Sequence, residues 1–334
     1  MKRNRMIHTP EGFRDLYGDE ARARRKLLQD LDEVFRRYGY EDIETPAVEY
    51  FDVFGSDVGT TPSNELYKFF DRDGNTLVLR PDFTPSVARA VAMHFSPDAM
   101  PYRLSYKGNT YVNSQEYQLN LKEQLQMGVE LIGDASAEAD AEILMLTCDL
   151  LKTAGLKEFQ VSCGNNDYFR ALAEESGLAE DEIEAVRQLT SNKNFFGVSE
   201  LMEGMRAPDR IREAFVKMPQ LFGGEEVLAE AEKYAASDGM HRAIGRLSTI
   251  SGLMAKHGYA QYLTYDFGLL SKYHYYTGMI FSAYTYGTGD AVAKGGRYDT
   301  LLMHFGMDAP AVGVGLYIDQ LRSALLRQGA RSES

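Results

Sequence analysis

A stretch of nine residues, 124–132, alternates between two kinds of side chain and constrains the fold more than any other part of the chain. Successive side chains of a β-strand point to opposite faces, so this alternation predicts a strand whose two faces have different roles. One face carries Leu125, Met127, Val129 and Leu131, and the other carries Gln124, Gln126, Gly128, Glu130 and Ile132. The apolar face is expected to pack against a core, so the second face is either solvated or lines a pocket.

A glycine lies between two hydrogen-bonding side chains on this second face. Gly128 leaves room for a ligand or another backbone to approach, and Gln126 and Glu130 flank it at about 6–7 Å along the strand. An amide and a carboxylate at this spacing suit a small cationic or zwitterionic molecule. Such residues also occur on solvated sheet faces, and the strand by itself favours that plainer arrangement.

Helical and extended patterns follow one another along the rest of the chain, and their order predicts an α+β fold with a mainly antiparallel sheet flanked by helices. Residues 165–257 contain several helix-like segments, which predict a mostly helical insertion between two parts of a core domain, 1–164 and 258–334. The expected helices span 19–39, 137–153 and 316–326, and the expected extended segments span 40–49, 65–80, 102–133, 262–265, 275–286, 291–293 and 311–315.

Prolines restrict two segments in the first quarter of the chain. Pro46 confines the extended segment 40–49 to a sheet edge or an interface, because proline donates no hydrogen bond to a neighbouring strand. Thr84 and Pro85 follow a predicted hairpin, and we expect Thr84 to cap a helix whose first residue is Pro85.

Charge and cysteine content exclude several classes of protein. The 334 residues carry a formal net charge of -13, which disfavours a nucleic acid as the main partner. The two cysteines, Cys148 and Cys163, fit no zinc or redox motif and favour a reducing, cytoplasmic setting. No run of about 18 apolar residues occurs, and no apolar signal region follows the basic N-terminus, so we expect neither a membrane span nor secretion.

Motifs for phosphate or metal binding are weak or absent in the sequence. Residues 287–289 and 313–315 begin like a dinucleotide-binding GxGxxG motif but lack its third glycine, so we expect turn and packing glycines there. The six histidines are scattered along the chain, which gives no support for a metal site or for another cofactor.

One group of hydrogen-bonding residues remains as a candidate site. Its members follow a predicted strand, lie on a strand face or form a tyrosine pair: Asp82, Thr84, Gln126, Glu130, Tyr275, Tyr276 and residues 296–299. The alternative is structural, with the tyrosines as core aromatics and Arg297 paired with Asp299 or a neighbour. Composition alone does not decide between these two interpretations.

The order of these segments resembles the catalytic domain of histidyl-tRNA synthetases, a class II aminoacyl-tRNA synthetase fold, over nearly the whole chain. Residues 39–46 look like the motif that forms the dimer interface of that family, and 79–84 resemble its Leu-Arg-Pro-Glu-Gly-Thr segment. Residues 103–133 align without a gap on its second motif. Residues 275–278 and 295–299 resemble its histidine-binding segment and the approach to its third motif.

The resemblance implies a histidine-binding pocket, because the residues that hold the amino group and imidazole in the synthetases are kept in type. The candidates for this role are Asp82, Thr84, Gln126, Glu130, Tyr275, Tyr276 and Tyr298. The arginines that would face the α-carboxylate are replaced, and Lys107 and Lys272 are the candidates to substitute for them.

Five replacements argue against the nucleotide chemistry of the synthetases. In that family an arginine that holds the α-phosphate stands at the position of Val112. An acidic residue that helps to hold ATP stands at the position of Ser114. In the synthetases a phenylalanine that stacks on adenine stands at the position of Gln124, and two further arginines stand at the positions of Ser271 and Gln320. Removing one positioned charge commonly costs about 10²–10³ in rate. We therefore expect no adenylation and no catalytic residues in this chain.

A synthetase-like core without nucleotide chemistry resembles the regulatory subunits of ATP phosphoribosyltransferase. That resemblance implies a short-form catalytic subunit as partner, at the first step of histidine biosynthesis. It also implies allosteric activation of that partner, feedback by L-histidine, and a homodimer within a larger hetero-oligomer. The sequence ends soon after the segment like the third motif, so we expect no anticodon-binding domain and no tRNA charging.

Two other classes of protein stay open at this point. One is a free-standing amino-acid sensor that serves a different partner. The other is a divergent amino-acid-activating ligase that uses the same fold with different residues.

Overall fold

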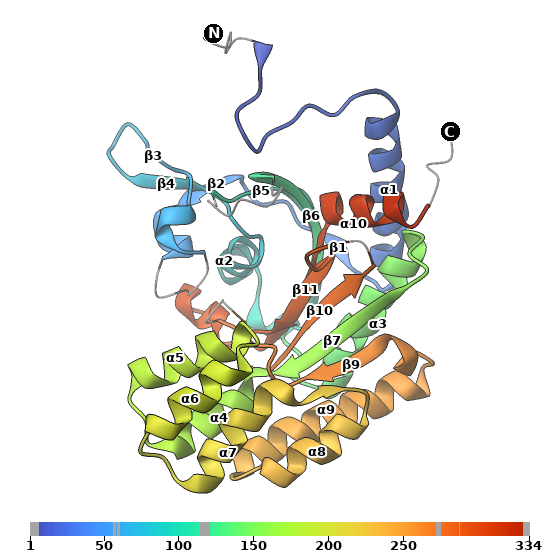
Figure 1. The fold of residues 1–334 in the computed structure, drawn as a ribbon. Helices are drawn as coiled ribbons and strands as arrows, with labels where there is room; N and C mark the ends of the chain where they lie inside the picture. The colour runs from blue at the N-terminus through green and yellow to red at the C-terminus, as the bar shows by residue number, and fades with distance from the viewer. Residues whose placement is uncertain are drawn as a thin grey trace, which may run out of the picture.

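The computed structural model describes residues 7–55, 58, 61–113, 121–271, 275–286 and 288–329. Its centre is a sheet whose strands lie in the order β1-β5-β6-β12-β11-β10-β7-β9-β8, and a second, smaller sheet has the order β2-β4-β3 (Figure 1). In the large sheet β1 with β5 and β7 with β9 are parallel, and the other pairs are antiparallel. The predicted α+β class with a mainly antiparallel sheet is confirmed.

The elements have the following bounds. The strands of the large sheet are β1 (Glu41–Asp42), β5 (Tyr102–Tyr111), β6 (Glu123–Ile132), β7 (Phe159–Asn165), β8 (Phe222–Gly223), β9 (Leu263–Asp266), β10 (Met279–Thr285), β11 (Ala293–Arg297) and β12 (Ala311–Tyr317). The small sheet has β2 (Val48–Tyr50), β3 (Lys68–Phe70) and β4 (Thr76–Leu79). The α-helices are α1 (Gly18–Arg37), α2 (Thr84–His94), α3 (Ala137–Thr153), α4 (Asn166–Ser176), α5 (Glu180–Ser191), α6 (Phe195–Gly204), α7 (Asp209–Lys217), α8 (Glu226–Tyr234), α9 (Asp238–Lys256) and α10 (Ile318–Arg327).

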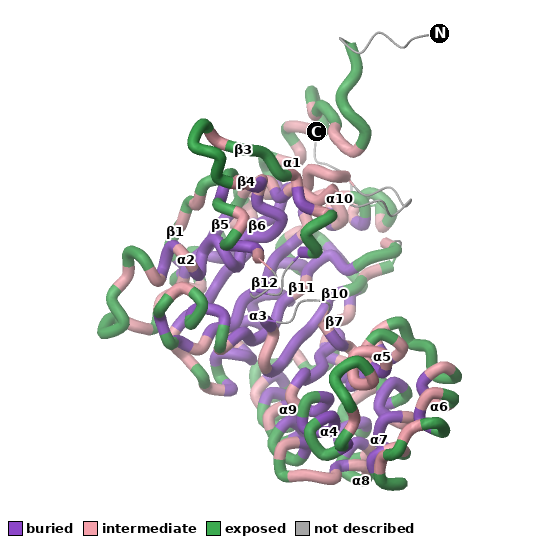
Figure 2. Tube along the Cα trace, turned by 90° about the vertical axis from the view of Figure 1, so that its left-hand side faces the viewer, coloured by how far each residue is buried: buried purple, intermediate pink, exposed green. Residues whose placement is uncertain are grey.

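The two faces of the large sheet pack against different helices, as the alternation in β6 predicted. Met127 and Leu131 belong to a large buried cluster with residues of α1, α3 and α10, and each of the two is 0% exposed. Ile132 points the other way, into a cluster that includes Val87 of α2. Figure 2 shows the central strands buried along most of their length. The polar residues of β6 therefore lie on the same side of the sheet as α2.

The segment between β7 and β9 is mostly helical, as expected. It contains α4–α9, which Figure 1 shows grouped at the end of the sheet away from α1 and α10. Its short strand β8 pairs with β9, and its apolar residues, such as Leu247, belong to the same buried cluster as those of β6. A separate insertion domain over residues 165–257 stays a prediction.

Two contacts tie this helical segment to residues 266–271, which comprise the last residue of β9 and the five residues after it. The Lys193 ammonium, in the turn between α5 and α6, lies 2.5 Å from a carboxylate oxygen of buried Asp266. The Arg187 guanidinium of α5 donates to the carbonyl oxygen of Ser271 at 3.5 Å. Leu269, Leu270 and Ser271 in turn line a cavity described below. The helical segment thus supports one wall of that cavity.

Several local predictions are corrected or refined. Thr84 does not cap α2: it is the first residue of the helix, Phe83 precedes it, and its hydroxyl bonds elsewhere. The strand expected over 275–286 begins only at Met279, and the strand expected over 291–293 runs from Ala293 to Arg297. The extended segment that contains Pro46 does lie at a sheet edge, because β1 is the first strand of the large sheet.

A buried ion-pair network joins α3, β11 and α9. The carboxylate of Asp140, which is 0% exposed, accepts hydrogen bonds from Arg297 at 2.8 Å and from Arg246 at 2.7 Å. Arg297 also pairs with Asp299 at 3.0 Å, as the structural interpretation of the sequence predicted. Removing one partner of such a buried pair leaves an uncompensated charge.

We predict that Asp140→Ala lowers the free energy of unfolding by about 3–5 kcal/mol, because Arg297 is then buried without its main carboxylate. Urea unfolding followed by circular dichroism measures this loss. The matched control is Asp30→Ala, which breaks the exposed pair with Lys26 on α1 and is expected to cost less than about 1 kcal/mol. Equal costs for the two variants would contradict the structural role of the network.

Candidate functional site

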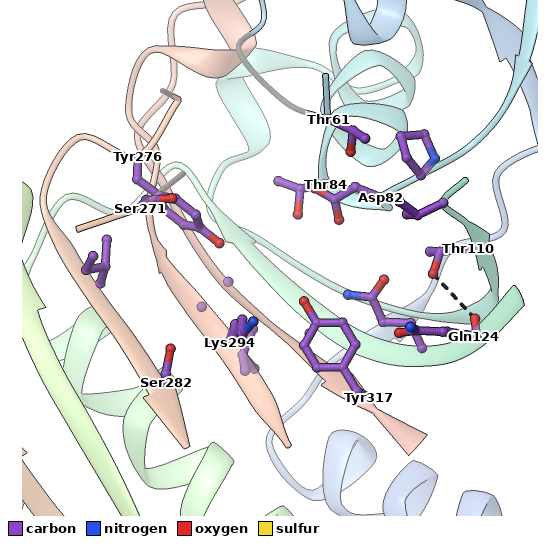
Figure 3. Close-up of a pocket in the computed structure, with 18 of the residues that line it drawn as sticks. Thr61, Asp82, Thr84, Thr110, Gln124, Ser271, Tyr276, Ser282, Lys294 and Tyr317 are labelled. Carbon is purple, nitrogen blue, oxygen red and sulfur yellow. Dashed lines mark hydrogen bonds between the residues drawn. The ribbon is translucent and has the colours of Figure 1, made fainter. Parts of the chain in front are cut away.

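A cavity of about 530 Å³ lies on the side of the large sheet that carries the polar residues of β6. Its floor is formed by β6, β12, β11 and β10, and its walls by the start of α2 and by residues 269–271 (Figure 3). All seven candidate residues line it: Asp82, Thr84, Gln126, Glu130, Tyr275, Tyr276 and Tyr298. Segments up to 216 positions apart in the sequence therefore meet at one place.

The carboxylate of Glu130 is the most buried acidic group of this cavity, at 1% exposed. The Thr84 hydroxyl donates to one of its oxygens at 2.8 Å, and the Tyr298 hydroxyl donates to the other at 2.5 Å. Gln126 is also buried, at 5% exposed. The polar face of β6 is thus not a solvated sheet face, and the plainer interpretation of the sequence was wrong.

A second carboxylate, Asp82, lies at the start of α2. It accepts a hydrogen bond from the Tyr275 hydroxyl at 3.1 Å and one from the backbone N–H of Phe83 at 2.7 Å. The Tyr275 ring lies 4.6 Å from the ring of Tyr276 and 6.0 Å from that of Tyr298, measured between centroids. Tyr275 and Tyr298 are therefore packed aromatics and hydrogen-bond donors at the same time.

Burial dominates the electrostatics of both carboxyl groups. It raises the pKa of Glu130 to about 8, against the lowering effect of the hydrogen bonds from Tyr298 and Thr84, while the nearby Asp82 charge raises it further. Burial also raises the pKa of Asp82, although Tyr275 and two backbone N–H groups oppose this. A cation placed between the two carboxylates would relieve the cost of ionising them.

Two glycines of β12 leave room for polar side chains of β6 to extend across that strand. A side chain at Gly313 would collide with the carboxylate of Glu130, and one at Gly315 with the amide of Gln126. Both head groups therefore lie over β12, and the two glycines are packing glycines as predicted. The space above Gly128 is filled by the Tyr106 side chain, so it is not the opening for a ligand that the sequence indicated.

Four of the five positions at which the family resemblance implies a replacement line the same cavity. Val112, Gln124, Ser271 and Gln320 are all in its wall, and Ser114 lies outside the described residues. The Gln320 amide donates to the side-chain oxygen of Gln124 at 3.5 Å, so two neutral amides meet where the family resemblance placed a stacking ring and an arginine.

The lysines near the cavity differ from those predicted. Lys107 bonds to Asp32 of α1 at 2.7 Å and does not line the cavity, so its proposed role was wrong, and Lys272 lies outside the described residues. Among the lining residues that the structure describes, the cations are Lys122 and Lys294, and there is no arginine.

Sequence reasoning missed several lining residues, of which Tyr106, Thr110 and Lys294 are the main polar ones. Tyr106 and Thr110 lie on one face of β5, and Lys107 lies on the other. Assigning the first face to the cavity would have found both residues. Lys294 and Arg297 are the two charged residues of β11, and they lie on opposite faces of the strand, so its register decides which of them faces the cavity.

The potential metal ligands and the cysteines were located among the residues that the structure covers. Within the described ranges no group of three or more His, Cys, Asp or Glu side chains is placed to hold a metal ion. Cys148 and Cys163 are buried and unpaired. The described helices include none that is both long and apolar enough to cross a membrane.

Comparison with known proteins gives consistent relatives. A family model described as histidyl-tRNA synthetase matches residues 12–321. The ATP phosphoribosyltransferase regulatory subunit of Acetivibrio thermocellus is 38% identical over 98% of this chain and 78% of its own length. That of Ruminiclostridium cellulolyticum is 36% identical over 97% of this chain and 77% of its own length.

Solved structures agree with these relatives. An ATP phosphoribosyltransferase regulatory subunit/histidyl-tRNA synthetase from Bacillus halodurans C is 32% identical, with a TM-score of 0.89 over 96% of this chain and 83% of that one. A histidyl-tRNA synthetase from Nostoc sp. PCC 7120 has a TM-score of 0.80 at 20% identity, over 97% of this chain and 76% of that one, and supports the fold alone.

The sheet, the cavity and the family match together define a histidyl-tRNA synthetase-like protein with the class II fold. Within this class, identity of 32–38% over nearly the full length decides the assignment. The chain belongs to the family of ATP phosphoribosyltransferase regulatory subunits. The family resemblance seen in the sequence is thus confirmed.

The raised pKa of Glu130 leads to a prediction about stability and pH. The ordinary pKa of a glutamate is 4.5, and that of Glu130 in the folded protein is about 8. Between these two pH values the carboxyl group of Glu130 keeps its proton in the folded protein and has lost it in the unfolded chain. The contribution of Glu130 to the free energy of unfolding is therefore largest at low pH and falls as the pH rises, by at most about 1.4 kcal/mol per pH unit.

Glu130→Gln is thus expected to become progressively more stable relative to the original protein as the pH rises from 5 to 8. Urea unfolding at several pH values measures the difference. Glu200→Gln, at an exposed position of α6, is the matched control and is expected to show no such trend. A difference for Glu130→Gln that does not change with pH would contradict the burial of an acidic proton at this site.

Proposed function

We propose that this chain binds a short-form catalytic subunit of ATP phosphoribosyltransferase, activates it, and carries L-histidine as feedback ligand in the cavity. The family assignment supports the partner, because the relatives are named as regulatory subunits of that enzyme. The observation that carries the ligand is the pair of buried carboxylates, Asp82 and Glu130, surrounded by tyrosine and threonine hydroxyls in one cavity.

The two carboxylates suit the two nitrogen-bearing groups of histidine. Glu130 accepts an imidazole N–H in this proposal, and a tyrosine hydroxyl bonds the other ring nitrogen. Asp82 accepts from the α-amino group, with the amide of Gln126 nearby. Charge-assisted hydrogen bonds of this kind are about twice as strong as neutral ones. The ligand also relieves the desolvation that burial imposes on both carboxylates.

The proposal includes the loss of nucleotide chemistry. Adenylation depends on positioned positive charge around the phosphates. The described part of the cavity wall presents the neutral side chains of Val112, Gln124, Ser271 and Gln320 at the positions where the resemblance expects four of the ATP-binding groups. An amide cannot replace a planar, permanently charged guanidinium. We infer that the chain activates no amino acid and charges no tRNA, in keeping with its net charge of -13.

Feedback in this proposal is a coupling between two binding events. Histidine binds unequally to the active and inactive states of the complex and shifts their balance, with a coupling of about 1–3 kcal/mol. Coupling is reciprocal, so the catalytic subunit also changes the affinity of this chain for histidine by the same factor. The complex is expected to work in the cytoplasm.

We further propose that the chain forms a homodimer within the complex. Val48, Tyr50 and Phe70 of the small sheet are 40%, 57% and 72% exposed, so this sheet presents apolar side chains to its surroundings. The sheet adjoins the segment 39–46, which resembles the dimer motif of the synthetases. An exposed apolar group of this kind is typical of an interaction surface.

The first prediction of this proposal concerns activity. A short-form catalytic subunit mixed with this chain is expected to gain phosphoribosyltransferase activity and to co-elute with it on size exclusion, and L-histidine is expected to reduce the gain. Co-elution without histidine sensitivity would contradict the feedback ligand. Absence of both activation and co-elution would favour a free-standing sensor.

The second prediction concerns the ligand, measured by calorimetry. The original protein is expected to bind L-histidine, and Glu130→Gln to bind it about 10- to 100-fold more weakly, because one charge-assisted hydrogen bond is lost. Glu200→Gln is the control and is expected to bind like the original protein. Histidine-dependent exchange of pyrophosphate into ATP would instead identify an amino-acid-activating ligase.

A further inference from the structure

The α-carboxylate of an amino-acid ligand lacks a partner in the site described so far. The arginines that the family resemblance expects there are absent, and Lys107 faces away from the cavity. We propose that Lys294 of β11 binds this carboxylate and so makes the cavity selective for an amino acid with a free α-carboxylate. The inference rests on the proposed amino-acid ligand and adds to it the residue that recognises the acidic end.

The sheet register places Lys294 at the correct distance from Glu130. Lys294 is paired with Gly315 of β12, and Gly313, two residues along that strand, is paired with Glu130 of β6. The missing side chain at Gly313 lets the Glu130 carboxylate lie over β12, one strand away from β11. Strand spacing and rise then put the carboxylate about 8 Å from the start of the lysine side chain.

That separation fits one amino acid. The flexible four-carbon stem of lysine lets its ammonium move above the sheet and adjust to a ligand between the two groups. The amide of Gln126 lies over Gly315, directly beside Lys294 in register, and forms the middle of the same surface. Figure 3 shows Lys294 between Ser282 and Tyr317 on the floor of the cavity. An imidazole at Glu130 and a carboxylate at Lys294 thus give the ligand a single orientation.

Other nearby cations are held elsewhere. Arg80 donates to the backbone carbonyls of Thr45 and Asn109 and stacks on the Phe83 ring at 3.8 Å. Arg297 is paired with Asp140 on the opposite side of the sheet.

Lys122 lines the cavity but lies too far from Glu130 for one amino acid to contact both. Eight residues of extended chain separate it from Glu130, which corresponds to about 26 Å. Its ammonium bonds to the side-chain oxygen of Asn113 at 3.0 Å. A single amino acid does not span that distance, so among the described cations that line the cavity Lys294 is the one in range.

The present partner of Lys294 is exchangeable. Its ammonium lies 3.1 Å from Asp290, and the two side chains are 42% and 54% exposed. Exposed ion pairs contribute little to stability, so a ligand carboxylate can take the place of Asp290 at low cost. The Tyr317 ring lies 5.7 Å from the ammonium and bounds the position of the ligand on one side.

The test compares a ligand that has the carboxylate with one that lacks it. Calorimetry measures L-histidine and histamine on the full chain, with Lys294→Met, Lys294→Arg and Lys122→Met. Lys294→Met is expected to weaken the binding of L-histidine about 10- to 100-fold and to change the affinity for histamine by less than about twofold. Lys294→Arg is expected to recover most of the loss, because it restores the positive charge. Lys122→Met is expected to bind both ligands as the original protein does.

Each outcome has a distinct meaning. If the original protein binds no L-histidine, the proposed function fails and this inference with it. If it binds L-histidine and Lys294→Met binds the amino acid equally well, the inference alone is overturned. Equal weakening of histidine and histamine in Lys294→Met would also overturn it, because the lysine would then act on the shape of the cavity and not on the carboxylate.

Discussion

The hydrogen bonds around the buried carboxylate of Glu130 hold together the parts of the chain that enclose the cavity. Glu130 belongs to β6, whereas its partners Thr84 and Tyr298 come from the start of α2 and from the residue after β11. A buried carboxyl group without hydrogen-bond partners would be destabilising, so these three segments must keep one arrangement. The small residues Gly313 and Gly315 then allow polar head groups to lie across the sheet, and the cavity is the space that remains above them.

Much of the fold could be predicted because local patterns determine it. The alternation over 124–132 assigned the two faces of β6 correctly, since a strand has a fixed side-chain period. The helix expected over 137–153 coincides with α3, whose start is capped by the Ser136 hydroxyl. The seven candidate residues were found through family motifs and all line one cavity. Their ligand stays a prediction, because lining a cavity does not identify what binds in it.

The remaining features depend on contacts between distant segments, which a local pattern does not contain. Threonine is a common helix-capping residue, yet the hydroxyl of Thr84 bonds to Glu130, 46 residues away. Lys107 and Lys294 both occur in strands, and only the register and twist of the whole sheet decide that the first meets α1 and the second meets the cavity. In the same way, the opening expected above Gly128 is closed by Tyr106 from the neighbouring strand.

The helices between β7 and β9 hold residues 266–271 in place through Lys193 and Arg187, and the inner side of that segment faces the cavity. An inserted element is often regarded as an accessory that evolution exchanges or deletes while the host domain keeps its function. Here every described residue that lines the cavity lies outside that helical segment, and the segment acts by supporting one wall. Substitutions in the turn between α5 and α6 are therefore expected to shift residues 266–271 and reshape the cavity from a distance, although that turn does not line it.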